Sequence, residues 1–482
     1  MIGQEFSGRT GAGHPAGAGR HRFRPGRRRR SAIRLPGRPG WLRRRPAGRR
    51  GQGSPFLITE FTALWATQLL SSAGDQLIQI AVAAGVYRQT GSPLLAALAY
   101  AISYAALLTG GPLLAEVAGL AARRSLLITL AAGRAVLAGL LATAGLPLAG
   151  NFALLVTALL LGGSFTAARA AELPGVLPPG RLAAGIAASS VSGRAGQALG
   201  FLAGGILLAA AGPTATGPAA TSPAAAGPAT TGTAAALLTA AALLLASAAV
   251  TAARLRVRPA PHRTPGRPLL LPVSRAEVTA LLRSPVARSL LVFAWLGGCA
   301  VVPAALAGPY ASELHAGPVA AGLLMAAVPA GALAGAAVCT LLVRPAARLQ
   351  PLSWLAAMSS GLLTVVVMRP PLWLVGLAWA AAGAGAGYQT TAAMSVVRAV
   401  PAADWARAAD LAGYGTVAIQ ALVLAAAGLG APLVGPRAVI AVTGLAGLAV
   451  GTTLGRGWHR RIGHRKPRQP RPAPASPHDH GW

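Results

Sequence analysis

The chain is 482 residues long, and 54% of its residues are hydrophobic whereas only 11% are charged. A water-soluble protein carries roughly a quarter of its residues as charged groups, so this composition excludes an ordinary soluble domain. The formal net charge of +33 would suit a nucleic-acid partner, but the arginines gather near the N-terminus, around 254–288 and after Arg456. Long apolar runs separate these clusters, and we therefore expect no nucleic acid to bind.

The two ends of the chain are basic and lack apolar periodicity. Residues 1–55 are rich in arginine, glycine and proline, a composition that cannot bury enough apolar surface to fold. We predict a disordered, Arg-rich cytoplasmic tail, although a translation start assigned too far upstream would explain the segment equally well. Residues 456–482 are predicted to form a second basic cytoplasmic tail.

Between the tails lie about twelve apolar segments, each close to the ~20 residues that a helix needs to cross a bilayer. They predict an all-α integral membrane protein with two six-helix pseudo-repeats, an N-terminal bundle over 56–252 and a C-terminal bundle over 288–455. The first six spans are predicted near 57–87, 93–116, 125–146, 150–173, 182–211 and 233–252. The second six are predicted near 288–308, 318–343, 351–368, 371–397, 409–430 and 436–455.

The charges of the connecting loops test this count, because loops that stay in the cytoplasm carry an excess of arginine. With the N-terminus inside, the outer loops hold only Arg88, Arg369 and Arg437. The inner loops hold Arg123, Arg124, Arg169, Arg181, the 254–288 cluster, Arg344, Arg348, Arg398 and Arg407. The alternation predicts a multi-pass protein of the cell membrane with both termini in the cytoplasm.

The connecting segments also carry signals of their own. Residues 253–287 are proline-rich and are predicted to be a cytoplasmic linker, in which 274–284 forms a short amphipathic helix on the anionic inner leaflet. The outer loop 212–232 is a Thr/Pro/Ala segment of low complexity, which we expect to be flexible. The runs 169–200 and 398–420 share a pattern: an arginine at the end of a helix, a turn that contains proline, a second arginine and an Ala/Gly-rich helix. This weak repeat favours two related halves.

A polar stripe runs along the first predicted span. Gln68, Ser72, Asp75 and Gln79 recur at helical spacing and therefore share one face, which lipid cannot satisfy. An acid inside a membrane is a functional candidate by default, so Asp75 is predicted to take up a proton or to pair with a cationic substrate. The other interpretations are a hydrogen bond between helices and a position near the outer interface that water reaches.

Two arginines lie deep in predicted spans, Arg134 in the third and Arg194 in the fifth, where Gln197 shares the face of Arg194. They are predicted either to bind an anionic or carbonyl-rich substrate or to pair with Asp75, since an uncompensated buried charge is strongly unfavourable.

The second half offers only neutral candidates. They are Trp295, Tyr310, Tyr388, Gln389, Tyr414 and Gln420. Amphipathic side chains of this kind suit an apolar ligand with a few polar groups, and they suit packing and membrane interfaces as well. The small number of inward charges favours a lipophilic substrate.

The sequence contains no pattern typical of an enzyme or of a cofactor site. The GAGAG run at 383–387 lies within an apolar span, where no dinucleotide loop can form. Cys299 and Cys339 give no metal or disulfide framework, and the His478 to His480 tract resembles a metal site only in composition. We therefore expect no catalytic residues, no metal and no cofactor.

Four stretches carry a resemblance to a known family. They are 61–92, 107–128, 308–335 and, most strongly, FTAARAAELPGVLPPGRLAAG at 165–185. In these stretches the chain resembles the major facilitator superfamily, and within it the bacterial efflux subgroup that includes siderophore and macrolide exporters. The resemblance implies a monomeric secondary transporter that exports a small molecule, with protons as coupling ions, by alternating access.

The fifth span carries a glycine pattern similar to the antiporter motif of that family. Gly196, Gly200, Gly204 and Gly205 match its glycines, whereas Phe201 stands at its proline position. Glycines at this spacing predict a close approach between helices.

The loop after the second span departs further from the family pattern, which has a glycine, an Asp-Arg pair and a basic run that latches the inner gate. Only Arg123 and Arg124 match, and Gly119 and Leu120 stand at the Asp and Arg positions. Glu116, one turn earlier, is a candidate replacement for the lost carboxylate. This departure favours an alternative hypothesis, a non-transporting membrane scaffold or sensor that acts through its basic tails.

Overall fold

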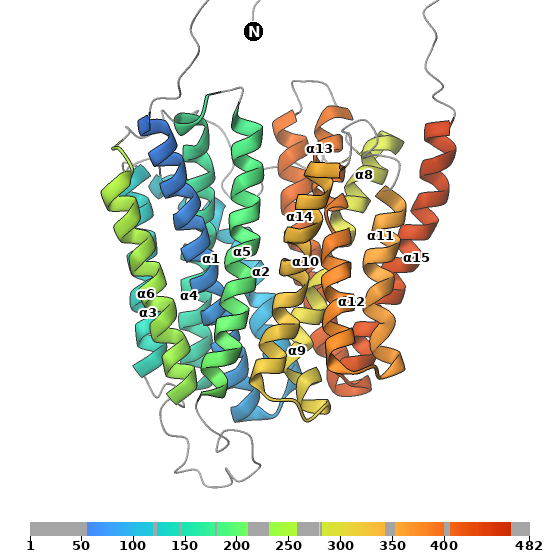
Figure 1. Cartoon of the computed structure of the whole chain (residues 1–482), viewed down its shortest axis with the longest axis horizontal. Coiled ribbons are helices and arrows are strands. Elements are labelled where there is room, and N and C mark those ends of the chain that lie inside the picture. Colours follow the sequence, from blue (N-terminus) through green and yellow to red (C-terminus); the bar gives the residue numbers. More distant parts are fainter. Residues whose placement is uncertain are drawn as a thin grey trace, which may run out of the picture. The chain divides into compact units, whose positions relative to one another are not determined.

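The computed structural model describes residues 55–118, 123–143, 147–178, 181–210, 231–257, 279, 282–342, 352–399 and 405–463. Every regular element in these residues is a helix, and no strand occurs among them (Figure 1). The predicted tails, the outer loop at 212–232 and the amphipathic helix at 274–284 lie wholly or largely outside the described residues.

Six long helices form the first half of the described chain. They are α1 (Pro55–Thr90), α2 (Pro93–Ala118), α3 (Arg123–Thr143), α4 (Leu148–Val176), α5 (Leu182–Ala209) and α6 (Thr231–Arg254). Pro55 and Pro93 stand at the first helical position, where a missing backbone N–H costs nothing. Gly91 adopts a φ of +63°, which lets the chain reverse between α1 and α2.

The second half contains shorter helices as well as long ones. They are α8 (Pro285–Leu296), η5 (Gly297–Val301), α9 (Val302–Glu313), α10 (Pro318–Leu342), α11 (Leu352–Gly361), η7 (Leu362–Met368), α12 (Leu372–Gly385), α13 (Tyr388–Ala399), α14 (Trp405–Val434) and α15 (Pro436–Gly463). Long helices therefore dominate the first half, whereas the second half combines long helices with shorter α and 3-10 segments.

Within the described residues, nine helical segments are long and apolar enough to cross a membrane. The predicted span 182–211 is not among them, because α5, although 28 residues long, carries three serines, Arg194, Gln197 and several glycines. The two remaining crossings are made of shorter apolar helices, α11 with η7 and α12 with α13. Together these elements give twelve crossings, so the predicted fold class is confirmed. The boundaries proposed for the domains stay a prediction.

Two predicted spans are interrupted near their middle, and a third, near 351–368, changes from α11 to the 3-10 helix η7 at Leu362. The span near 288–308 becomes α8, η5 and α9, because Gly297, Gly298 and the helix-breaking Pro303 favour a tighter helix at this point. The span near 371–397 ends as α12 at Gly385 and resumes as α13 at Tyr388, within the glycine-rich GAGAG run. Hydropathy alone cannot show such breaks, since the residues on both sides remain apolar.

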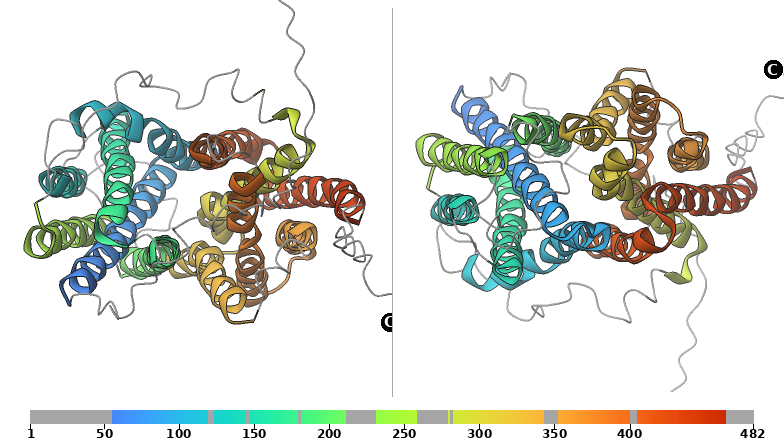
Figure 2. Two further views of the ribbon diagram at one scale, coloured as in Figure 1. Left: turned by 90° about the horizontal axis from the view of Figure 1, so that it is seen from above. Right: turned by 90° about the horizontal axis from the view of Figure 1, so that it is seen from below.

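The helices of each half pack mainly on one another, and Figure 2 shows the blue-to-green helices and the yellow-to-red helices as two neighbouring groups. The pairs α5–α10 and α2–α14 make most of the contacts between the halves. The helix α1 begins and α15 ends at the top of Figure 1. We call this the terminus side and the opposite end of the helices the far side.

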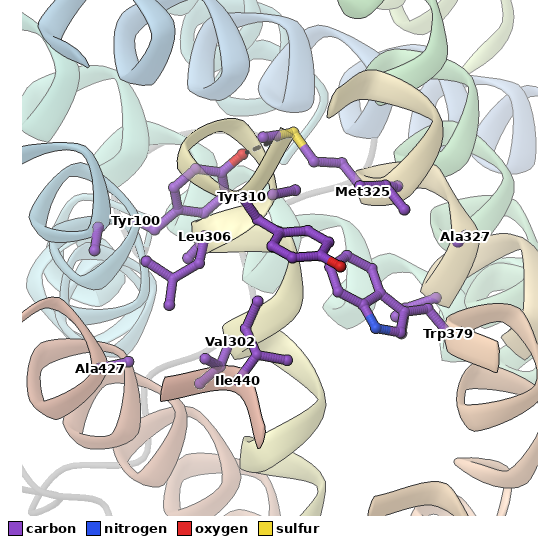
Figure 3. Packing of buried hydrophobic residues seen from close by; sticks show 14 of the residues in the cluster. Tyr100, Val302, Leu306, Tyr310, Met325, Ala327, Trp379, Ala427 and Ile440 are labelled. Carbon is purple, nitrogen blue, oxygen red and sulfur yellow. Dashed lines mark hydrogen bonds between the residues drawn. The ribbon is translucent and has the colours of Figure 1, made fainter. Parts of the chain in front are cut away.

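One apolar cluster joins the halves, and it lies toward the far side. It contains Ile80 from the second part of α1, Tyr100 near the start of α2 and Phe201 from the second part of α5, together with residues of α9 and α10. The Tyr100 hydroxyl donates to Met325 Sδ across the two halves, over 3.5 Å (Figure 3).

The clusters on the terminus side contain residues of one half only. One cluster is built from the first part of α1, the start of α3 and the ends of α4 and α6. The other is built from α8, α13 and the starts of α11 and α14. The halves thus share a core on the far side, whereas each keeps its own core on the terminus side.

Candidate functional site

A buried ion pair connects α1 and α3. Arg134 of α3 is fully buried, and its guanidinium donates to the carboxylate of Asp75 in α1. The same guanidinium donates two further hydrogen bonds, of 3.0 and 3.1 Å, to the Ser71 hydroxyl one turn earlier in α1. The Asp75 side chain keeps 24% of its surface exposed. The pair is therefore reached by solvent only from the side of the carboxylate.

Helix α4 closes the ion pair from another direction. The guanidinium carbon of Arg134 lies 5.3 Å from the ring centre of Phe165, a cation–π contact. A Cβ added to Gly162 would lie 3.6 Å from Arg134 Nε and 3.7 Å from Asp75 Oδ1, so α4 presents backbone to the pair. Arg134 Nε itself is buried and has no hydrogen-bond partner. Removing either charged partner would leave an uncompensated charge in this apolar setting, which costs about 3–5 kcal/mol.

The first two residues of the polar stripe of α1, Gln68 and Ser72, face α5. Gln68 donates to the Ser72 hydroxyl over 2.9 Å, and a Cβ on Gly193 of α5 would lie 3.2 Å from Gln68 Nε2. Gln68 Oε1 is buried without a hydrogen-bond partner, and Gln79 is also buried. The stripe is thus divided: Asp75 turns toward α3, whereas Gln68 and Ser72 lie along α5.

The second arginine of the first half, Arg194 in α5, does not join the ion pair. Its side chain is exposed and donates to Gln197 Oε1 over 3.4 Å. It also lies close enough to Tyr104 of α2 for an electrostatic interaction. Among the described residues, no carboxylate comes within ion-pair distance of Arg194. Of the two arginines proposed to pair with Asp75, only Arg134 does so, and Arg194 keeps an accessible positive charge.

The helix-five glycines lie at two different contacts. A Cβ on Gly196 would lie 2.5 Å from the Leu69 carbonyl oxygen, and one on Gly200 would lie 2.6 Å from the carbonyl oxygen of Ala73. A Cβ on Gly204 would lie 2.5 Å from Ile80 Cγ2, also in α1, whereas Gly205 faces α10. Three glycines therefore set the approach of α5 to α1, and the fourth sets its approach to the other half.

The arginines of the predicted gate loop begin α3. Arg123 donates to the carbonyl oxygen of Ala171 over 2.9 Å, and Arg124 donates to that of Ala252. These carbonyls lie near the C-terminal ends of α4 and α6, where a positive charge is favourable. Both arginines are thus bound within the first half. The Glu116 side chain and residues 119–122 lie outside what the structure describes.

Sequence reasoning missed a set of buried charged residues on the terminus side. Arg169, predicted in a loop, lies within α4, is 5% exposed and donates to the Ser189 hydroxyl over 3.2 Å. Glu172 is also buried, and the buried Glu60 forms an ion pair of 3.6 Å with Arg256. Their burial could have been suspected from the sequence, because Glu60 and Arg169 are charged residues within otherwise apolar runs.

In the second half, polar groups gather beside the two helix breaks. Gln389, which follows the break between α12 and α13, presses its amide against Gly297 at the start of η5. The indole edge of Trp295, whose Nε1 is buried without a hydrogen-bond partner, lies against Gly415 of α14. The two interrupted crossings therefore meet at a candidate residue predicted from the sequence, Gln389.

An aromatic pair lies further toward the far side. The rings of Tyr310 in α9 and Trp379 in α12 are 6.1 Å apart at an angle of 33° (Figure 3). Both side chains are buried, and neither the Tyr310 hydroxyl nor Trp379 Nε1 has a hydrogen-bond partner. The sequence offered Tyr310 as a neutral candidate, but it gave no sign of Trp379, which lies in a uniformly apolar run.

Neither a protein-family model nor the sequence of a curated protein matches the chain. Solved structures do match it. A bacterial homologue of the human lysosomal transporter Spinster, inward-facing and occupied, superposes with a TM-score of 0.64 at 14% identity, over 84% of this chain and 97% of that one. A D-xylose–proton symporter gives a TM-score of 0.58 at 15% identity, over 82% of this chain and 97% of that one. The nucleoside transporter NupG gives 0.59 at 10% identity, over 84% and 99%.

The fold is that of the major facilitator transporters. At these identities the likeness establishes the architecture of the chain, a multi-pass membrane protein, and not its substrate.

Proposed function

We propose that the chain is a proton-coupled secondary transporter of the plasma membrane that exports a lipophilic small molecule by alternating access. Its termini lie in the cytoplasm, so that the terminus side is the inner side. The secondary transporters among the structural neighbours support transport, and the loop arginines support the orientation. The direction of transport follows from the resemblance to exporters seen in the sequence.

The observation that carries the proposal is the ion pair of Asp75 and Arg134. Protonating Asp75 removes the negative charge that compensates Arg134 and leaves the buried guanidinium with neutral partners, among them the Ser71 hydroxyl and the ring of Phe165. The resulting change in the α1–α3 contact is a direct way for a proton to alter helix packing. The partial exposure of Asp75 gives the proton a route, and the full burial of Arg134 makes the loss of its partner costly.

Arg194 supports a proposal for the chemical class of the substrate. It is the accessible positive charge of the fifth crossing, with Gln197 and Tyr104 as polar neighbours. A guanidinium without a carboxylate partner suits an oxygen-rich or anionic group. We therefore propose a substrate with an apolar body and at least one carboxylate or carbonyl oxygen.

The packing of the two halves supports alternating access. The core that joins them lies on the far side, and the cores on the terminus side are separate. Under the proposed orientation this is a state closed to the outside. The Spinster homologue was likewise solved in an inward-facing state. Rocking of the halves about the α5–α10 and α2–α14 contacts would then expose the other side.

Deletion of the gene followed by metabolite profiling of cells and medium tests the proposal. A lipophilic metabolite should accumulate inside the deletion strain and fall in its medium. The wild-type gene should restore export at a rate that depends on external pH. The Asp75→Asn variant, present in the membrane at the same level, should lose that pH dependence. Unchanged coupling in this variant would remove Asp75 from the proton route.

Identical metabolite profiles with and without the gene, across many growth conditions, would instead favour the second candidate, a membrane scaffold or sensor. One observation supports this alternative: Arg123 and Arg124, which would latch the inner gate in the family, are both engaged with carbonyls of the first half.

A further inference from the structure

A groove runs between α11 and α15, which lie side by side at one edge of the array (Figure 1). Its volume is about 500 Å³. Its floor is backbone, because a Cβ on Gly451 would lie 3.1 Å from the Ala357 nitrogen and one on Gly455 would lie 2.8 Å from Ser353 Cβ. Its wall is apolar, since Trp354 and Met358 line it and keep 68% and 51% of their surface exposed. In a membrane protein such a surface faces hydrocarbon.

The groove ends in a positive charge where the apolar span of α15 ends. Arg456 lines its terminus-side end, is exposed, and is the residue at which the apolar span of α15 stops. Thr452, one turn earlier, is exposed and lines the groove as well. An apolar groove that ends at a guanidinium matches a phospholipid, whose acyl chain would lie in the groove and whose phosphate would lie at the arginine.

A second groove repeats this design in the first half. It lies between α1 and α6, has a volume of about 580 Å³ and is lined mainly by alanine, valine and threonine. Arg254 lines it, is exposed, and is the residue at which the apolar span of α6 stops. The last helix of each half thus places an arginine at the terminus-side end of a surface groove.

We propose that the α11–α15 groove is a binding site for an anionic phospholipid of the leaflet on the terminus side. One acyl chain lies along Trp354 and Met358, and the phosphate binds Arg456. Guanidinium groups bind phosphate with two parallel hydrogen bonds, and a zwitterionic lipid gains less from the same charge. This site does not depend on the proposed transport function, because it lies on the outer surface of two helices and not at the ion pair.

Quenching of Trp354 fluorescence by lipids with brominated chains tests the site on the purified full-length chain in detergent micelles. The difference between the protein and its Trp354→Phe variant isolates the signal of this one tryptophan. Brominated phosphatidylglycerol is compared with brominated phosphatidylcholine of identical chains. One arginine near a membrane surface contributes ~1 kcal/mol toward an anionic lipid, which corresponds to about fivefold preference.

The expected result is a severalfold preference for phosphatidylglycerol at Trp354 that disappears in Arg456→Gln. Arg369→Gln is the matched control and should leave the preference intact. Arg369 is also an exposed arginine, but it lies at the far-side end of the crossing that contains Trp354, formed by α11 and η7. Trp373, 69% exposed at the far-side start of α12, should show no response to Arg456→Gln. Equal quenching by both lipids at Trp354, or a preference that survives Arg456→Gln, would overturn the proposal.

Discussion

Gly205 of α5 and Gly322 of α10 meet across the two halves, and a Cβ built on Gly205 would lie 2.8 Å from the Cα of Gly322. The contact is reciprocal, because a Cβ on Gly322 would lie 2.7 Å from the Cα of Gly205. Two backbones that touch in this way leave no flexible atom to move aside. The far-side closure of the halves therefore depends on the absence of side chains at these two positions.

The Gly205→Val substitution is expected to open the far side. Its side chain would force α5 and α10 apart, and so expose residues of the shared cluster such as Met325. With Cys299 and Cys339 replaced by serine, a cysteine substituted for Met325 should react severalfold faster with an impermeant maleimide added to intact cells. The matched control is Gly139→Val, since Gly139 has nothing within 4 Å of its Cβ position. Equal labelling of the two variants would show that the glycine contact does not hold the far side closed.

The ion pair predicts a specific pattern in a double-mutant cycle. Arg134→Met leaves the Asp75 carboxylate without its partner, and Asp75→Asn leaves the fully buried guanidinium without its own, each of which should lower the free energy of unfolding by about 3–5 kcal/mol. The double variant should lose less than the sum of the two single losses, because neither charge then remains. The measurement is unfolding in detergent micelles. Strictly additive losses would mean that the two side chains stabilise the fold independently.

The glycines of α5 and α4 should respond differently to alanine. Gly200→Ala would place a methyl group 2.6 Å from the backbone oxygen of Ala73, and it should lower the free energy of unfolding by about 1–3 kcal/mol. Gly162→Ala meets its nearest atom at 3.6 Å, an ordinary contact, and should change that free energy by less than about 1 kcal/mol. If the two variants proved equally stable in detergent, α5 would not pack on α1 as closely as described.

The crossings were predictable because the bilayer requires each membrane-spanning helix to be about 20 residues long and mainly apolar, and both properties can be read directly from the sequence. Even α5, which is not among the nine segments that are long and apolar enough to cross a membrane, was predicted as a helix over 182–211, close to its observed bounds. The interruptions at η5 and between α12 and α13 were not predictable, since glycine and proline are tolerated in membrane helices when neighbouring helices satisfy the freed backbone groups.

The partner of Asp75 was not predictable either. Arg134 and Arg194 both lie deep in their spans, and only the rotation of α3 and α5 about their axes decides which one faces α1. Sequence spacing fixes which residues share a face of one helix, but it says nothing of the helix that this face meets. For the same reason, the burial of Arg169 within α4 and its contact with Ser189 emerged only from the structure.

The Tyr310 hydroxyl offers a last test, because it is buried without a hydrogen-bond partner beside Trp379. A buried polar group that makes no hydrogen bond costs about 1–3 kcal/mol, so Tyr310→Phe should leave the free energy of unfolding unchanged or raise it. Tyr310→Ala, which removes the ring from the core, should lower it by about 3–5 kcal/mol. Thermal unfolding in the same detergent compares the two. A Tyr310→Phe variant that proved clearly less stable than the wild type would contradict the prediction and would show that the hydroxyl holds a partner, such as a bound water, in the folded protein.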